Sequence, residues 1–279
     1  MNLRKSLFIL PNLFTLSSIF CGFDAIRLVA TAQSPDLQPQ PYYAAALLLV
    51  FAMFFDTIDG RVARLTKTQS AFGVQIDSLA DVVSFGVAPA ILTYRWALSD
   101  LGTVGLMVSF VFLACGAIRL ARFNVLAMGN EKKPAKPGKY IVGLPIPGAA
   151  GVILAIIIAN HSVHGRIFAA KPLIVGIVLG LSALMVSTIS FRSFKDLRLN
   201  SRTLAMLALA LGSTAGVAFE FGPAFALPWV LGCYIGIALI ESVVMFPRRR
   251  RERREERRRL AAQRVAMADE RDAQSPEQI

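Results

Sequence analysis

The sequence predicts an all-α integral membrane protein, a bundle of about eight transmembrane helices. Of its 279 residues, 55% are hydrophobic and 17% are charged, and the mean hydropathy is +0.56. Soluble domains are usually about 45–50% apolar and about 25% charged, so this composition disfavours a soluble domain and excludes disorder for most of the chain. Apolar runs recur at roughly the 20 residues that a helix needs to cross ~30 Å of hydrocarbon. None alternates apolar and polar residues as a membrane β-strand would.

Eight such runs follow one another along the chain. The first comes directly after MNLRKS, but it is too long for a signal peptide and ends without a clear cleavage site, so we expect a retained span. The later runs are rich in glycine and have less definite ends. The predicted spans cover residues 7–31, 43–60, 73–94, 103–124, 143–162, 172–190, 203–221 and 225–246. We expect residues 1–246 to form one transmembrane domain.

Basic residues predict the orientation of the spans. With eight spans, both termini face the same side, and the segments on that side hold 26 of the 30 Lys and Arg residues. Lys and Arg are enriched in the cytoplasmic loops of membrane proteins, so both termini should be cytoplasmic. The opposite side holds the other four: Arg27, Arg95, Arg166 and Lys171.

The chain ends in an Arg-rich segment, residues 247–279, which we expect to form a partly disordered cytoplasmic tail. From residue 248 onward it holds eleven arginines and seven acidic residues. Its basic beginning follows the last span directly, where it could attract anionic lipid headgroups or simply anchor the topology. Because the +12 net charge of the chain lies in this tail and in short connections, nucleic acid is not an expected partner.

Four carboxylates crowd into residues 56–81, where the second predicted span ends and the third begins. Asp56 and Asp59 are three residues apart, and Asp77 and Asp81 are four apart, so each pair shares one helix face. Ionisable side chains in membrane segments are costly and mark functional sites by default. Small residues lie on the same faces and allow another helix or a ligand to approach closely. These are Gly60 and Ala63 on the second span and Gly73 on the third.

Carboxylates that face one another need either protons or cations between them. Hard oxygen ligands suit Mg²⁺ or Mn²⁺, and two-metal sites are a known device for phosphoryl transfer. Arg64, one turn after Gly60, is a residue type that grips phosphate oxygens. Two alternatives remain open from these residues alone. One is a carboxylate cluster that serves packing or carries protons, and the other is a cation channel or transporter.

Residues 56–81 read DTIDGRVARLTKTQSAFGVQIDSLAD. This segment resembles the signature of the CDP-alcohol phosphatidyltransferase family: DxxDGxxAR, eight residues, then GxxxDxxxD. Further segments resemble the bacterial phosphatidylserine synthases of that family. They are PNLFTL at 11–16, CGF at 21–23, DSLADVVSFGVAPA after the motif, ACGAIRLARFNV at 114–125, GLPIPGAAG at 143–151 and MVSTISFRSFKDL at 185–197.

The resemblance implies a reaction and a set of residue roles. CDP-diacylglycerol would donate a phosphatidyl group to the hydroxyl of L-serine and release CMP, in a bacterial inner membrane. Asp56, Asp59 and Asp77 would hold two divalent cations, Mg²⁺ or Mn²⁺. Asp81 would complete the second metal site and act as the general base. The CDP-diacylglycerol pocket would be lined by Gly60, Ala63, Arg64, Ser70 and Gly73.

The acceptor lies outside the shared motif, so glycerol phosphate, inositol phosphate and choline remain alternatives to serine. The segments at 114–125 and 143–151 favour serine. Arg119 and Arg122 are three residues apart on one face and are candidates for binding the serine carboxylate, with Asn124 a further candidate. The expected partners are the two substrates, membrane lipids and a second copy of the chain, because homodimers are common in this family.

Overall fold

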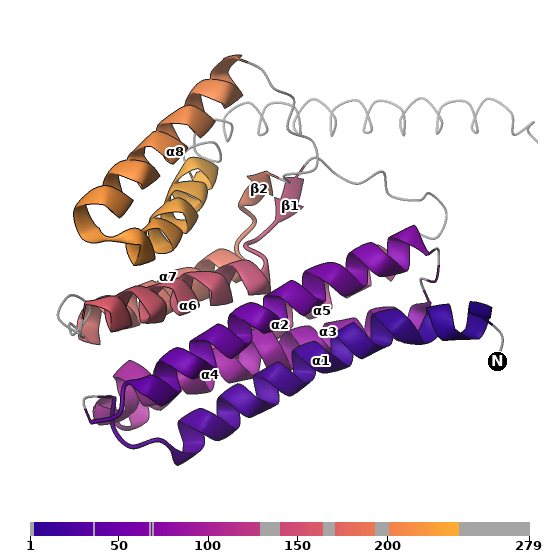
Figure 1. The fold of residues 1–279 in the computed structure, drawn as a ribbon, viewed down its shortest axis with the longest axis horizontal. Coiled ribbons are helices and arrows are strands. Elements are labelled where there is room, and N and C mark those ends of the chain that lie inside the picture. Colours follow the sequence, from indigo (N-terminus) through magenta and orange to yellow (C-terminus); the bar gives the residue numbers. More distant parts are fainter. Residues whose placement is uncertain are drawn as a thin grey trace, which may run out of the picture. The chain divides into compact units, whose positions relative to one another are not determined.

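The computed structural model describes residues 3–35, 37–66, 68, 70–128, 140–163, 171–192 and 201–239. Helices make up nearly all of it, as the sequence predicts (Figure 1). Four helical segments are long and apolar enough to cross a membrane, which indicates a membrane protein. They are Pro11–Thr31, Gln40–Leu65, Ala71–Leu101 and Thr103–Val125. The predicted tail, residues 247–279, lies outside the described residues.

The first four predicted spans each correspond to one of these segments. α1 is Leu3–Thr31, α2 is Gln40–Leu65 and α5 is Thr103–Met128. The third segment is composite, because two π-helical stretches interrupt its α-helical geometry. In chain order it consists of α3 (Ala71–Asp81), the π turn η1 (Val82–Val87), α4 (Ala88–Thr93), the π turn η2 (Tyr94–Leu98) and the 3₁₀ turn η3 (Ser99–Leu101).

The last four predicted spans also contain helices, but their apolar helical stretches in the described residues are shorter. All are below the ~20 residues that a straight crossing needs: Ile146–Ser162, Lys171–Val186, Ala208–Phe221 and Pro223–Leu239. The structure therefore supports four membrane-length helices and leaves the predicted number of eight as a proposal. The elements are α6 (Ile146–Ser162), α7 (Lys171–Val186), α8 (Ser201–Phe221), the 3₁₀ turn η5 (Pro223–Phe225) and a helix over 226–239.

Two short strands depart from the purely helical prediction. β1 (Tyr140–Val142) pairs antiparallel with β2 (Ser190–Arg192), so the expected spans at 143–162 and 172–190 are shorter as helices. Gly143 ends β1 with a φ of +79°, and a Cβ atom there would lie 2.5 Å from the carbonyl oxygen of Met185. Only glycine fits this turn, and α6 begins three residues later.

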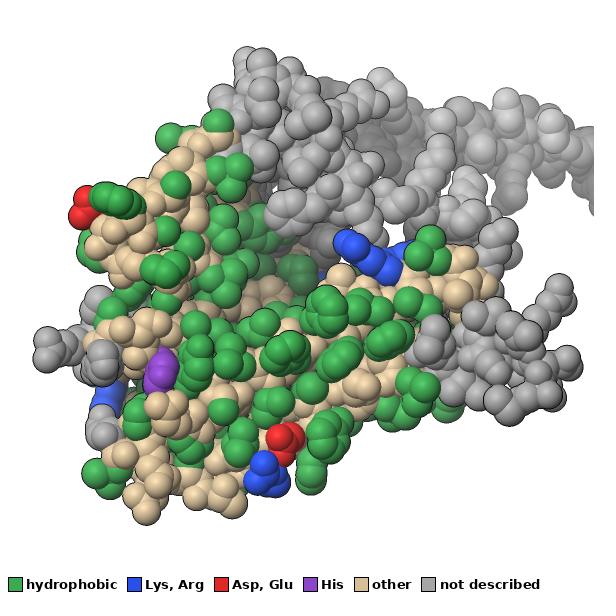
Figure 2. All heavy atoms as spheres, viewed as in Figure 1, with side chains coloured by type: hydrophobic (Ala, Val, Ile, Leu, Met, Phe, Trp, Pro, Cys, Tyr) green, Lys and Arg blue, Asp and Glu red, His purple; other side chains and the backbone are tan. Residues whose placement is uncertain are grey.

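The core lies around α6, whose apolar side chains are buried on nearly every side. It packs against α2, α5 and α7 as well as η1 and α4. The other faces of α1, α2 and α5 carry exposed apolar side chains, including Phe20, Phe54 and Phe110. Figure 2 shows such side chains spread over the visible surface. A broad apolar exterior around a packed interior is what a lipid environment requires.

α1 contacts α2 along its length and also packs on α3, η1 and α4. At the crossing with η1, a Cβ atom on Gly22 would lie 3.0 Å from the Cα atom of Ser84, so the two backbones are nearly in contact. The Ser84 hydroxyl donates to the carbonyl of Ser18 over 3.0 Å. At the other end of α1, Arg95 donates to the carbonyl oxygen of Ala32 over 2.7 Å.

Candidate active site

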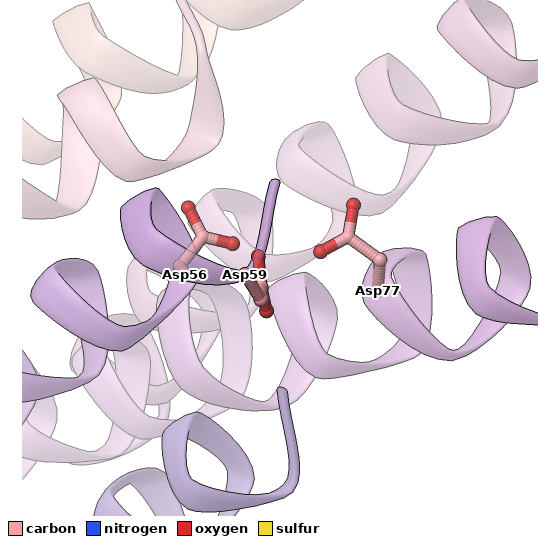
Figure 3. A group of neighbouring side chains, drawn as sticks. All are labelled: Asp56, Asp59 and Asp77. Carbon is pink, nitrogen blue, oxygen red and sulfur yellow. The ribbon is translucent and has the colours of Figure 1, made fainter. Parts of the chain in front are cut away.

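Three of the predicted carboxylates come together between α2 and α3. Asp56 and Asp59 lie on one face of α2, because they are three residues apart, and Asp77 faces them from α3. One oxygen of each lies within 4.8 Å of the others. Figure 3 shows Asp59 between Asp56 and Asp77, with one of its oxygens turned toward the space they share. The i,i+3 spacing therefore predicted the arrangement on α2 correctly.

Asp81 lies one turn beyond Asp77, at the last residue of α3 before η1. Its side chain is within hydrogen-bonding reach of Asp56, which places all four motif carboxylates in one neighbourhood. Its Oδ1 atom is buried and has no hydrogen-bond partner among the residues that the structure describes. A buried, unpartnered carboxylate oxygen is costly and is the kind of group that a ligand or a proton completes.

A fifth polar side chain reaches the cluster from α1. Thr15 donates its hydroxyl hydrogen to Oδ2 of Asp59 over 2.7 Å, and both residues are only 4% exposed. Thr15 is not among the predicted site residues, although it lies in the PNLFTL segment. A hydroxyl residue in an apolar helix gives no periodic signal, and its partner is 44 residues away in the sequence.

The residues predicted to line a nucleotide pocket lie between the two aspartate pairs in the sequence. Gly60, Ala63 and Arg64 continue along α2, and the exposed Arg64 folds its guanidinium over Gly60, 3.6 Å from where a Cβ atom would stand. Ser70 is the N-cap of α3, and its Oγ accepts a hydrogen bond from the backbone N–H of Gly73 over 2.9 Å. Ser70 thus has a structural role at the start of the helix that carries Asp77 and Asp81.

The three candidates for acceptor binding all lie on α5, but they differ in burial and in their distance from α3. Arg119 is half-buried, lies near enough to attract Asp81, and has a buried Nε without a hydrogen-bond partner in the described residues. Its guanidinium also lies 5.6 Å from the centre of the Phe123 ring. Asn124 donates its amide to the Ser78 hydroxyl on α3 over 2.9 Å. Arg122 is exposed, so the structure brings Arg119 and Asn124 toward α3 and leaves Arg122 outside.

The donor set of this cluster fits a divalent cation. Carboxylate oxygens are hard ligands, and several of them within 4.8 Å of one another repel unless positive charge lies between them. In the described residues, Arg64 attracts Asp59 and Arg119 attracts Asp81. The arrangement can therefore hold hard cations and, through them, bind phosphate oxygens.

The sequence also matches known proteins. Residues 8–187 match the family model described as CDP-alcohol phosphatidyltransferase. This segment runs from α1 through α7 and contains all the motif carboxylates.

Individual relatives cover most of the chain. A protein of Helicobacter pylori strain J99 named CDP-diacylglycerol–serine O-phosphatidyltransferase is 37% identical over 239 residues, covering 86% of this chain and 93% of the relative. A protein of the same name from Bacillus subtilis strain 168 is 34% identical, covering 67% of this chain and 91% of the relative. A protein of Methanothermobacter thermautotrophicus named archaetidylserine synthase is 36% identical, covering 68% of this chain and 73% of the relative.

Proposed function

Because the chain belongs to the CDP-alcohol phosphatidyltransferase family, we propose that it transfers the phosphatidyl group of CDP-diacylglycerol to the hydroxyl of L-serine and releases CMP. The observation that carries the proposal is the meeting of the motif aspartates of α2 and α3 in one cluster. Serine as the acceptor is supported by the relatives, whose names share serine and differ in the lipid.

Asp56, Asp59 and Asp77 would hold the divalent cations, Mg²⁺ or Mn²⁺, with Asp81 beside them. Bound there, the cations would bind the pyrophosphate oxygens of the donor and neutralise the charge that develops on CMP. Around this centre, Arg64 would contact the phosphates. The small residues would leave room for the nucleotide: Gly60, Ala63 and Gly73, with Ser70 at the start of α3.

Asp81 would act as the general base. As the serine oxygen forms its bond to the phosphorus that carries diacylglycerol, the bond from that phosphorus to the CMP oxygen breaks, and the hydroxyl proton passes to a carboxylate oxygen of Asp81. A serine hydroxyl is a weak nucleophile, so a positioned base is expected to matter. The buried Oδ1 atom of Asp81, which has no partner in the described residues, is available for that proton.

Arg119 is the favoured partner for the serine carboxylate. It lies near enough to attract Asp81, and its buried Nε–H has no acceptor among the residues that the structure describes. Asn124, fixed to α3 through Ser78, would offer its amide oxygen to the serine ammonium. The exposed Arg122 would have at most a peripheral part in acceptor binding, for example by attracting the carboxylate.

We place the catalytic cluster at the cytoplasmic ends of α2 and α3, in a bacterial inner membrane, with both termini cytoplasmic and about eight spans. The positive-inside distribution of Lys and Arg supports this topology. A second copy of the chain is a further proposed partner, as in the homodimers common in the family. Cross-linking in membranes tests the dimer. Topology reporters fused after residue 35 and after residue 279 test on which side of the membrane each position lies.

A transfer assay on purified protein in detergent tests the function. CDP-diacylglycerol and Mg²⁺ or Mn²⁺ are supplied with L-serine, glycerol 3-phosphate, inositol phosphate or choline in parallel, and CMP release is measured. We expect release that depends on serine and stops in EDTA. CMP release with a different acceptor would support the reaction type and contradict serine as the acceptor. No release with any acceptor from folded protein would overturn the proposal.

A further inference from the structure

We propose that Thr15 of α1 is a positioning residue for the metal site, orienting Asp59 so that one carboxylate oxygen faces the cation. This inference rests on the proposed function for its meaning in catalysis, but its geometry is independent of the acceptor. It gives α1, which carries none of the motif aspartates, a defined part in the site.

The hydrogen bond fixes one of the two oxygens of Asp59. The Thr15 hydroxyl lies 2.7 Å from Oδ2, and burial of both residues excludes competing water from this contact. Figure 3 shows one Asp59 oxygen turned toward the space between Asp56 and Asp77 and the other turned away, and the ligand atoms of the three residues lie within 4.8 Å of one another. Ligating carboxylates are commonly held by such hydrogen bonds, whose loss typically costs about 10–100-fold in metal affinity or activity.

The Thr15 hydroxyl has a second acceptor, the Pro11 carbonyl of its own helix, at 3.1 Å. A threonine in an apolar helix often bonds the carbonyl four residues earlier, and that contact alone would give it no role in the site. Two observations favour Asp59 as the main acceptor. Its oxygen is nearer, and a carboxylate is a stronger acceptor than a carbonyl.

Ser17 is a matched control on the same helix. Its hydroxyl donates to the Leu13 carbonyl, four residues earlier, over 2.8 Å, and within the described part of the chain it makes no hydrogen bond to the carboxylate cluster. Ser17→Ala removes a bond of the kind that Thr15 makes to Pro11, without touching the cluster. Any effect found for Thr15 and absent for Ser17 therefore reports the contact with Asp59.

The experiment measures Mn²⁺ binding to purified full-length protein without substrates, by the loss of the free-Mn²⁺ electron paramagnetic resonance signal. Thr15→Val replaces the hydroxyl with a methyl group of similar shape. We expect it to weaken Mn²⁺ binding by about 10-fold or more, whereas Ser17→Ala leaves binding unchanged. Thr15→Ser restores the hydroxyl and should bind Mn²⁺ within about threefold of the wild type.

Thermal unfolding in EDTA shows whether each variant is folded before Mn²⁺ is added. Thr15→Val should unfold somewhat below the wild type there, because it leaves the buried Oδ2 atom of Asp59 without its donor, and a cooperative transition shows that its loss of affinity is not a loss of the fold. Wild-type affinity in Thr15→Val would overturn the inference, and so would equal weakening in Thr15→Val and Thr15→Ser. If Thr15→Val does not fold, the Thr15→Ser result decides alone: weakening of 10-fold or more overturns the inference, and near-wild-type affinity supports it.

The same proteins, assayed for CMP release, distinguish this inference from the proposed function. If the wild type releases CMP with serine while Thr15→Val binds Mn²⁺ normally, the inference fails and the function stands. If the wild type shows no transfer while Thr15→Val binds Mn²⁺ weakly, the inference stands and the function fails. If both hold, Thr15→Val should need more Mn²⁺ for half-maximal CMP release, and a saturating concentration should recover most of its turnover.

Discussion

Replacing Asp77 with asparagine should change the stability of the protein in opposite directions with and without a divalent cation. Without metal, the ligand oxygens of Asp56, Asp59 and Asp77 lie within 4.8 Å of one another. Two like unit charges at that distance repel by about 3 kcal/mol at an effective dielectric constant of about 20. Asp77→Asn keeps the shape and removes one charge, so the metal-free variant should be more stable than the wild type by on the order of 1–3 kcal/mol.

With Mn²⁺ the order should reverse. A ligand present at about 1,000 times its Kd stabilises the state that binds it by about 4.1 kcal/mol, which exceeds the gain expected in EDTA, and the variant has lost one of the ligands that supply this energy. The assay is thermal unfolding in detergent, in EDTA and in saturating Mn²⁺. We expect the variant to unfold several degrees above the wild type in EDTA and below it in Mn²⁺.

Asp100→Asn is the matched control for this experiment. Asp100 lies in the same composite helical segment, at its far end, where it is exposed and paired with Lys171. Its replacement should leave the Mn²⁺-dependent change in unfolding temperature at the wild-type value. An Asp77→Asn protein that is equally destabilised in EDTA and in Mn²⁺ would refute both the repulsion and the shared cation.

The remaining predictions concern catalysis and the tail. Asp81→Asn should lower the turnover of serine-dependent CMP release by about 10²–10⁴-fold and weaken Mn²⁺ binding less than Asp77→Asn does; near-normal turnover would exclude it as the base. Arg119→Ala should raise the serine concentration needed for half-maximal rate much more than Arg122→Ala does. A larger increase for Arg122→Ala would assign binding of the serine carboxylate to Arg122. Truncation after Pro247 should leave activity in detergent within about twofold of the full chain, and its loss would assign the tail a part in folding or catalysis.

The motif carboxylates show how far the sequence could be interpreted. Helical spacing put Asp56 and Asp59 on one face of α2, and the structure brings a carboxylate oxygen of Asp77 within 4.8 Å of theirs, as expected. This worked because an intrahelical face depends only on local geometry. The special cost of charges in an apolar segment also made these residues conspicuous before any packing was known.

Features that depend on packing between helices could not be predicted in this way. Thr15 was missed because its importance comes from the approach of α1 to α2, which no local pattern encodes. The exposure of Arg122 beside the half-buried Arg119 follows from how α5 packs against α7 and η1. The glycine turn at Gly143 shortened a predicted span, since an apolar run does not reveal a backbone that must bend away from the carbonyl of Met185.

The contacts of α1 with the composite segment fix how these two helices can move in a bilayer. The Ser84 hydroxyl donates to the Ser18 carbonyl, and further along the Arg95 guanidinium donates to the Val29 carbonyl. The two residues of each pair are 66 positions apart in the sequence. The two helices therefore run parallel in one register, joined at points eleven residues apart, or about 16 Å. A slide of one helical turn would break both attachments. In a thinner or thicker bilayer, α1 and the composite segment should therefore tilt together as one unit. Asp77 and Asp81 then keep a constant position along the membrane normal relative to α1.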